Sequence, residues 1–121
     1  MSKRILVVED HEENRRILRD LLTSAGYEMI EALTGEDGVR LAESERPDLI
    51  LMDIQLPGLD GYEATRRIKA NPAPRQIPVI VVTSYALSGD DQKAFRAGCD
   101  AYVAKPFSPR ELLAKIRQHL G

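Results

Sequence analysis

Residues 49–61 read LILMDIQLPGLDG. Four apolar residues run directly into Asp53, and the turn-forming Pro57 and Gly58 follow soon after. A short apolar run that is bounded by turn residues is typical of a strand buried on both faces of a sheet. In open α/β sheets, ligands bind beyond the carboxyl ends of the strands. Asp53 is therefore either a functional residue at that edge or an ordinary turn aspartate.

The composition fits one domain that spans residues 1–121. A hydrophobic content of 43% is enough for a core, and a net charge of −2 gives no general attraction to nucleic acid or to an anionic membrane. The single cysteine, Cys99, excludes an intrachain disulfide and fits a reducing compartment. The sequence has neither a signal-peptide pattern nor an apolar stretch long enough to span a bilayer, so we expect a cytoplasmic protein.

Four further segments predict strands that alternate with helices. Residues 5–8 and 79–82 are uniformly apolar and predict interior strands, whereas the more polar 27–32 and the short 101–104 predict edge strands. Five strands that alternate with five helices indicate a parallel sheet covered on both faces. We therefore predict an α/β, doubly wound (βα)5 flavodoxin-like fold with strand order 2-1-3-4-5.

The predicted helix starts carry capping residues. In four of them an N-cap side chain is followed three positions later by an acid. These caps are Thr34, Asp60, Ser88 and Ser108. The spacing of apolar residues places Ile17 on the buried face of the first helix. Met52, Val81 and Phe95 are interpreted as core residues, and Cys99 as a small packed side chain.

Polar side chains stand where four of the predicted strands end. They are Glu9, Asp10, Asp53, Thr83 and Lys105. Strand ends of a parallel sheet share one edge, so carboxylates should crowd there, and such crowding raises their pKa values or requires a cation. Hard oxygen ligands suit Mg²⁺, and a carboxylate beside Mg²⁺, a lysine and a hydroxyl is equipped for phosphoryl transfer. Taken singly, each residue is also explained as a cap, a turn residue, a solvated side chain or a β-former.

Together these motifs resemble the receiver domain of two-component response regulators over nearly the whole chain. The resemblance rests on Glu9-Asp10, on residues 51–61, on Val82-Thr83-Ser84 and on Lys105-Pro106-Phe107. It implies that Asp53 accepts a phosphoryl group from a phosphohistidine on a partner protein. It also implies that Lys105 and Thr83 bind the phosphoryl oxygens.

The resemblance further implies a Mg²⁺ ion held by Asp10, Asp53 and the backbone carbonyl of Gln55, with Glu9 acting through water. The peptide bond between Lys105 and Pro106 is expected to be cis, as it usually is in the family.

A switch is implied in the same way. Thr83 would move toward the phosphoryl group and Tyr102 would turn inward, which would change the face formed by the fourth helix, the fifth strand and the fifth helix. Tyr102 is equally explained as an edge-strand aromatic that covers the core. The resemblance also implies a role for Gln55 and Tyr85, which occupy positions that in the family tune the lifetime of the phosphoryl group. His11 is interpreted as a solvated helix-start residue rather than a metal ligand, and His119 as incidental.

The expected partners are a histidine kinase or histidine phosphotransfer protein and a downstream protein target, with the chain a monomer or weak dimer. The chain is expected to be a self-phosphorylating phosphoacceptor, which could also lose the group by its own hydrolysis, rather than an enzyme. Because it ends after the last predicted helix, and because residues 84–90 resemble single-domain cell-cycle regulators, we expect a stand-alone regulator. The alternatives are a phosphorelay intermediate, a receiver fragment of a hybrid histidine kinase or larger regulator, and a phosphorylation-independent interaction module.

Two other classes fit the sequence less well. A phosphohydrolase of the haloacid dehalogenase type needs a second acid two residues after its nucleophile, where this chain has Gln55. A flavodoxin-like flavin binder needs a Ser-, Thr- or Gly-rich phosphate loop after the first strand. Residues 9–13 read EDHEE there and would repel a phosphate.

Overall fold

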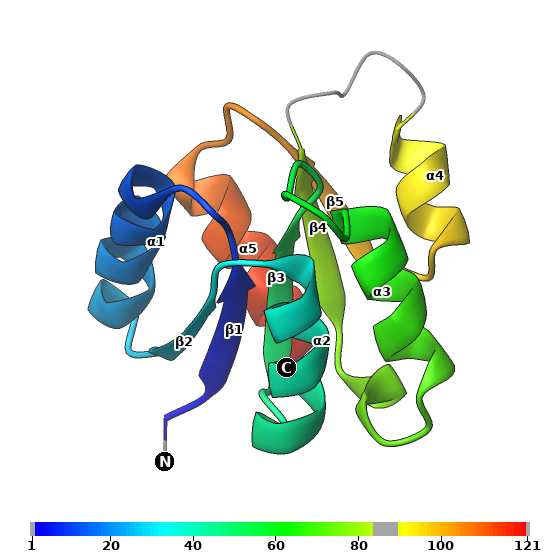
Figure 1. The fold of residues 1–121 in the computed structure, drawn as a ribbon. Helices are drawn as coiled ribbons and strands as arrows, with labels where there is room; N and C mark the ends of the chain where they lie inside the picture. Colours follow the sequence, from blue (N-terminus) through cyan, green and yellow to red (C-terminus); the bar gives the residue numbers. More distant parts are fainter. Residues whose placement is uncertain (1, 84–89, 121) are drawn as a thin grey trace.

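A computed structural model describes residues 2–83 and 90–120, which form a parallel five-stranded sheet with helices on both faces (Figure 1). The strands are β1 (Arg4–Val8), β2 (Glu28–Ala32), β3 (Leu49–Asp53), β4 (Val79–Thr83) and β5 (Ala101–Ala104). Their order is β2-β1-β3-β4-β5, and every adjacent pair is parallel. The predicted fold class and strand order are confirmed.

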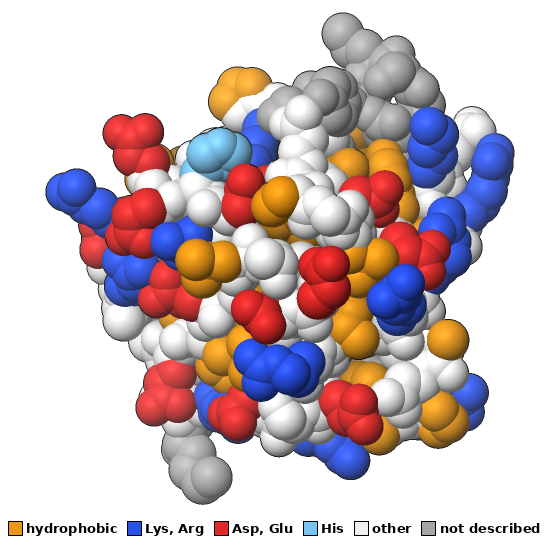
Figure 2. All heavy atoms as spheres, viewed as in Figure 1, with side chains coloured by type: hydrophobic (Ala, Val, Ile, Leu, Met, Phe, Trp, Pro, Cys, Tyr) orange, Lys and Arg blue, Asp and Glu red, His pale blue; other side chains and the backbone are white. Residues whose placement is uncertain are grey.

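The helices follow the strands in alternation. They are α1 (Glu12–Ser24), α2 (Gly35–Glu45), α3 (Gly61–Ala70), α4 (Asp90–Arg96) and α5 (Pro109–Leu120), with a 3-10 turn η1 (Pro74–Gln76) that we did not predict. Among the described residues, no helix is both long and apolar enough to cross a bilayer. Acidic and basic side chains are interspersed over the face that carries α2 and α3 (Figure 2), in keeping with the small net charge.

Three of the predicted caps are made by the side chains expected. The side chains of Thr34, Asp60 and Ser108 each accept a hydrogen bond from the backbone N–H three residues on, at 3.1, 2.9 and 3.0 Å. Each bond satisfies one of the backbone donors left free at a helix start. The fourth predicted cap, Ser88, lies outside the described residues.

The strand side chains alternate between two apolar layers. Ile5 and Val7 of β1 pack in the layer under α1 and α5, whereas Leu6 and Val8 pack in the layer under α2, α3 and α4. All four are almost fully buried. Both faces of the central strands are covered, and this explains why their sequences are uninterrupted apolar runs.

Two predicted core residues are exposed. Ile17 is 60% exposed and Phe95 is 51% exposed, so both predictions are wrong. Leu18 and Ala94, one position away, take the buried places on α1 and α4. Periodicity locates an apolar stripe, but the neighbouring elements decide how much of its width is covered. Met52, Val81 and Cys99 are buried, as predicted.

The amino-end edge of the sheet is held together by one lysine. The Lys69 ammonium donates to the carbonyls of Arg75 and Ile77 at 3.1 and 2.8 Å and to the Asp100 carboxylate at 2.8 Å. The neighbouring Cys99 is buried, and burial together with the Asp100 charge raises the pKa of its thiol to about 11. This edge is therefore tightly bonded and its thiol is unreactive.

Candidate functional site

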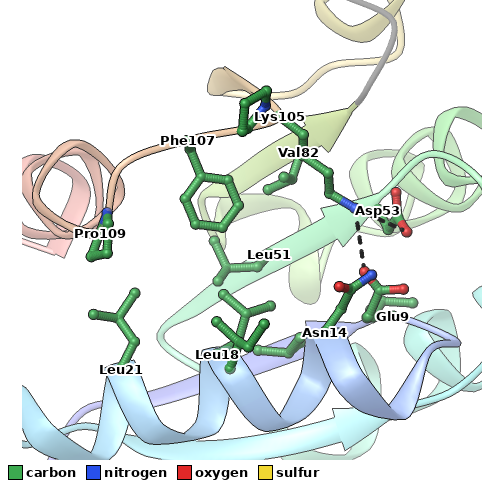
Figure 3. Close-up of a pocket in the computed structure, with 14 residues that line it drawn as sticks. Glu9, Asn14, Leu18, Leu21, Leu51, Asp53, Val82, Lys105, Phe107 and Pro109 are labelled. Atoms are coloured by element: carbon green, nitrogen blue, oxygen red, sulfur yellow. Dashed lines mark hydrogen bonds and ion pairs between the residues drawn. The ribbon is translucent and has the colours of Figure 1, made fainter.

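Three charged side chains meet at the carboxyl edge of the sheet (Figure 3). Glu9 follows β1, Asp53 ends β3 and Lys105 follows β5. The Lys105 ammonium lies 3.4 Å from Glu9 Oε1 and 3.6 Å from Asp53 Oδ2. Both carboxylates are nearly buried, at 3% and 7% exposure. The strand order produces this grouping, because β1 lies directly beside β3.

The loop after Asp53 folds back over the end of β3. The backbone N–H of Gln55 donates to Asp53 Oδ1 at 3.3 Å, and that of Gly61 donates to the Ile54 carbonyl at 3.0 Å. A Cβ at Gly61 would lie 2.1 Å from the carbonyl oxygen of Asp53. Only glycine fits this close approach, and the loop thereby fixes the place where β3 ends and α3 begins.

The two buried carboxyls titrate in opposite directions. Burial, reinforced by the charge of Glu9, raises the pKa of Asp53 to about 6, and the Lys105 charge only partly opposes this. Burial also acts to raise the pKa of Glu9. A hydrogen bond from the His11 N–H, the Lys105 charge and the bond with Asp53 outweigh it, so the pKa of Glu9 is lowered. As the pH falls, Asp53 is therefore expected to take up a proton before Glu9 does.

Asp10, the second residue of the acidic pair Glu9-Asp10, faces a histidine. Asp10 is 26% exposed, yet its Oδ1 is shielded from solvent and accepts no hydrogen bond from any residue that the structure describes. Nδ1 of His11 lies 3.2 Å from this oxygen, and the same nitrogen lies 3.4 Å from Glu9 Oε2. The His11 ring is 68% exposed, as predicted, but its contact with both acids was not foreseen.

Two further predicted residues, Thr83 and Tyr102, lie on β4 and β5. Thr83 is buried at the end of β4, and its carbonyl accepts a hydrogen bond from the Lys105 N–H at 2.6 Å. The Lys105–Pro106 peptide bond is cis, as expected. Tyr102 is half-buried on β5 and packs against the layer under α2, α3 and α4. Tyr85 lies outside the described residues. The functional roles of these residues stay predictions.

Arg15 was missed by the sequence analysis. Its side chain is buried, and its guanidinium donates to the Glu9 carbonyl at 2.9 Å, to Glu31 at 3.2 Å and to Glu12 at 2.5 Å. Arg15 thus ties α1 and β2 to the backbone of the acidic pair. It stands three residues before Leu18 on the buried stripe of α1, and that spacing was the available signal.

An apolar groove of about 680 Å³ opens beside the carboxylates. It runs between α1 and the segment that joins β5 to α5, with Leu18 and Leu21 on one side and Phe107 and Pro109 on the other (Figure 3). We call it the α1 groove. The exposed Ile17 also lines it. Apolar surface left open next to a polar site is typical of a docking surface.

The open parallel sheet carries paired acids, a buried aspartate and a lysine at its carboxyl edge, which is the arrangement that the resemblance to receiver domains led us to expect. Residues 5–117 match the response regulator receiver domain, and the chain belongs to this family. It is a receiver domain of two-component signalling.

Its relatives include single-domain regulators. The chain is 44% identical over 121 residues to the polar-differentiation response regulator DivK of Brucella anthropi, covering 100% of this chain and 98% of that protein. It is 43% identical to DivK of Brucella melitensis biotype 1 with the same coverage.

Solved structures agree with this assignment. The receiver domain of sensor histidine kinase PA1611 from Pseudomonas aeruginosa PAO1 is 41% identical, with a TM-score of 0.94 over 100% of this chain and 99% of that one. That domain holds a magnesium ion in its active site cleft. The Vibrio cholerae chemotaxis protein CheY4 is 25% identical, with a TM-score of 0.91 over 99% of this chain and 100% of that one.

Proposed function

We propose that Asp53 is a phosphoacceptor that takes a phosphoryl group from a phosphohistidine on a partner protein. The observation that carries this proposal is the nearly buried Asp53 carboxyl between Glu9 and the Lys105 ammonium, 3.6 Å away. An oxygen of the Asp53 carboxylate attacks phosphorus, the bond from phosphorus to the histidine nitrogen breaks, and the imidazole leaves. The Lys105 ammonium and the Thr83 hydroxyl are suited to bind the phosphoryl oxygens.

The donor set fits a divalent cation such as Mg²⁺. The Asp10 Oδ1 atom is shielded and accepts no hydrogen bond from the described residues, so its lone pairs are available to a cation. Asp10, Asp53 and the backbone carbonyl of Gln55 would hold the ion, with Glu9 acting through water. All are hard oxygen ligands. Bound there, Mg²⁺ would supply positive charge that neutralises the phosphoryl oxygens.

The output would be a change of the face formed by α4, β5 and α5. Thr83 stands at the end of β4, and its carbonyl is bonded to Lys105, so a shift of Thr83 toward a phosphoryl group would reach β5 directly. Tyr102 lies half-buried on β5 and would turn inward in response. Gln55, and Tyr85 outside the described residues, would tune the lifetime of the phosphoryl group, including its loss by hydrolysis.

The partners would be a histidine kinase or a histidine phosphotransfer protein and a downstream protein target. The α1 groove lies beside Asp53, so a protein seated there would present its phosphohistidine to the carboxylate. We propose a cytoplasmic monomer or weak dimer of one domain.

The test is the intact mass after incubation with a small acyl phosphate, with and without Mg²⁺, for the wild type and for Asp53→Asn. We expect a Mg²⁺-dependent gain of one phosphoryl group that the substitution abolishes. No gain would leave a phosphorylation-independent interaction module as the better account, and a gain unchanged in the variant would mean that Asp53 is not the phosphoacceptor.

A second candidate is a receiver that works as part of a hybrid histidine kinase or larger regulator. The 41% identity to a receiver domain of a sensor histidine kinase favours it almost as strongly as the 44% identity to DivK favours a stand-alone regulator. The two candidates share the chemistry of Asp53. They differ in whether the phosphoryl donor and the target are separate proteins.

A further inference from the structure

His11 does not do what a residue at the start of a helix usually does. It is the N-cap of α1, with extended backbone angles, but its side chain makes no capping hydrogen bond. Ser, Thr, Asn and Asp are preferred at this position because their side chains make that bond. The His11 N–H is turned to Glu9 Oε2, at 3.2 Å. Helix capping therefore gives no reason for an imidazole here.

The imidazole nitrogen points at two carboxylates instead. Nδ1 lies 3.2 Å from Asp10 Oδ1 and 3.4 Å from Glu9 Oε2, and the possible ligand atoms of the three residues all lie within 4.8 Å of one another. Metal–ligand bonds of about 2.1 Å separate adjacent ligands by about 3.0 Å in an octahedron and about 3.4 Å in a tetrahedron. The two distances from Nδ1 fall in the range that a shared divalent ion requires.

The surroundings favour a cation at this point. Glu9 is only 3% exposed. Asp10 Oδ1 is shielded from solvent yet accepts no hydrogen bond from the described residues. The His11 ring itself remains accessible, at 68% exposure. An ion at this point would meet Asp10 Oδ1 and the His11 imidazole nitrogen directly, with Glu9 Oε2 acting through water.

We propose that Nδ1 of His11 is a ligand to the divalent cation at the acidic pair, which makes the site a mixed nitrogen and oxygen centre. Imidazole suits Ni²⁺, Zn²⁺, Cu²⁺ and iron, whereas Mg²⁺ and Mn²⁺ prefer oxygen ligands. His11 therefore shifts the preference of the site toward transition metals. The inference rests on the proposed function only in placing a divalent cation beside Asp10.

The first test compares metal affinities of the metal-free full chain by calorimetry. We expect His11→Gln and His11→Asn to weaken Ni²⁺ binding by about tenfold or more while Mg²⁺ binding changes by less than about twofold. His11→Asn also supplies a favoured N-cap, so loss of the helix start cannot explain its effect. The matched control is His119→Gln, in the last turn of α5, which should change neither affinity.

The second test identifies the ligand directly. Pulsed electron paramagnetic resonance of the Mn²⁺-loaded wild type should show nitrogen modulation from a coordinated imidazole. The modulation should vanish in His11→Gln and persist in His119→Gln. An unchanged Ni²⁺ affinity in His11→Gln, an equal loss for both metals, or modulation that survives the substitution would each overturn the inference.

The outcome is separable from that of the proposed function. If the wild type gains a Mg²⁺-dependent phosphoryl group on Asp53 but binds Ni²⁺ independently of His11, this inference alone is wrong. If the wild type binds neither metal at Asp10, both are wrong.

Discussion

Ionisation of Asp53 lowers the free energy of unfolding of the metal-free protein, because the charged carboxylate is buried beside Glu9. Its pKa is raised from 3.8 to about 6 in the folded chain and returns to its ordinary value on unfolding. The folded state therefore binds the proton more tightly than the unfolded state. Protonation of Asp53 therefore stabilises the folded state fully below about pH 4, and this stabilisation is lost as the pH rises through about 6.

Asp53→Asn should accordingly stabilise the metal-free protein at pH 7. The uncharged amide avoids the cost of the buried charge, so we expect the free energy of unfolding to rise by about 2 kcal/mol, measured with urea. The gain should shrink as the pH falls to about 4, where the wild-type carboxyl is itself protonated. Asp20→Asn, on the exposed side of α1, is the matched control and should change little. A destabilised variant at pH 7 would contradict the pKa assignment.

Lys105 contributes the positive charge between the two carboxylates. Lys105→Met keeps most of the side-chain volume but removes the ammonium, so the phosphoryl oxygens would lose a binding group. We expect phosphorylation of Asp53 by a small acyl phosphate to slow on the order of 100-fold. Time-resolved intact mass measures the rate, with the exposed Lys3→Met as the control. A rate equal to that of the wild type would remove Lys105 from the proposed mechanism.

The loop from β3 to α3 depends on the missing side chain of Gly61. Because a Cβ there would lie 2.1 Å from the Asp53 carbonyl oxygen, Gly61→Ala should displace the end of β3. We expect a loss of about 3 kcal/mol in the free energy of unfolding, together with slower phosphorylation. Gly26→Ala is the comparison, since Gly26 has a φ of +90° but a Cβ added there would have no contact within 4 Å. It should lose about 1 kcal/mol, from backbone conformation alone. Equal losses would show that the close contact is unimportant.

The strands were predictable because burial on both faces leaves uninterrupted apolar runs, as in residues 79–82. The edge strands were predictable because they are more polar or shorter, but composition alone did not fix the strand order, which was predicted because it is one of the common doubly wound orders. That order brings Glu9 and Lys105 to one edge although they are 96 positions apart. Helix starts were readable from short-range capping chemistry, as at Ser108.

The rest depends on contacts that periodicity does not encode. The exposure of Ile17 depends on whether the segment that joins β5 to α5 covers that side of α1, and the α1 groove between them leaves it open. The burial of Arg15 depends on acceptors supplied by Glu9 and by Glu31 of β2. The direction of the His11 ring follows from the turn at the end of β1, which is a matter of geometry rather than of sequence spacing.

The α1 groove connects the chemistry to a partner, so it can be tested apart from the chemistry. Ile17→Glu places a charge in the groove at a side chain that is already 60% exposed, so the fold should tolerate it. We expect transfer from a phosphorylated histidine phosphotransfer domain to slow about tenfold, and labelling by a small acyl phosphate to stay unchanged. Leu33→Glu changes a residue that is 49% exposed and does not line the groove, and it serves as the control. Equal slowing with both donors would place the effect in the chemistry instead.

The buried thiol of Cys99, at the amino-end edge of the sheet, is a built-in probe of local opening. Cys99 is the only cysteine, and its raised pKa and burial leave it almost inert until the structure around it opens. The rate at which a thiol reagent labels it therefore counts openings of a region that no phosphoryl group or metal ion touches. If the molecule opens as one unit, a ligand that binds only the folded chain at the opposite edge should slow the labelling of Cys99. A labelling rate that saturating Mg²⁺ leaves unchanged would mean that the two edges open independently. The single native cysteine is therefore enough to distinguish opening of the whole molecule from opening of one edge.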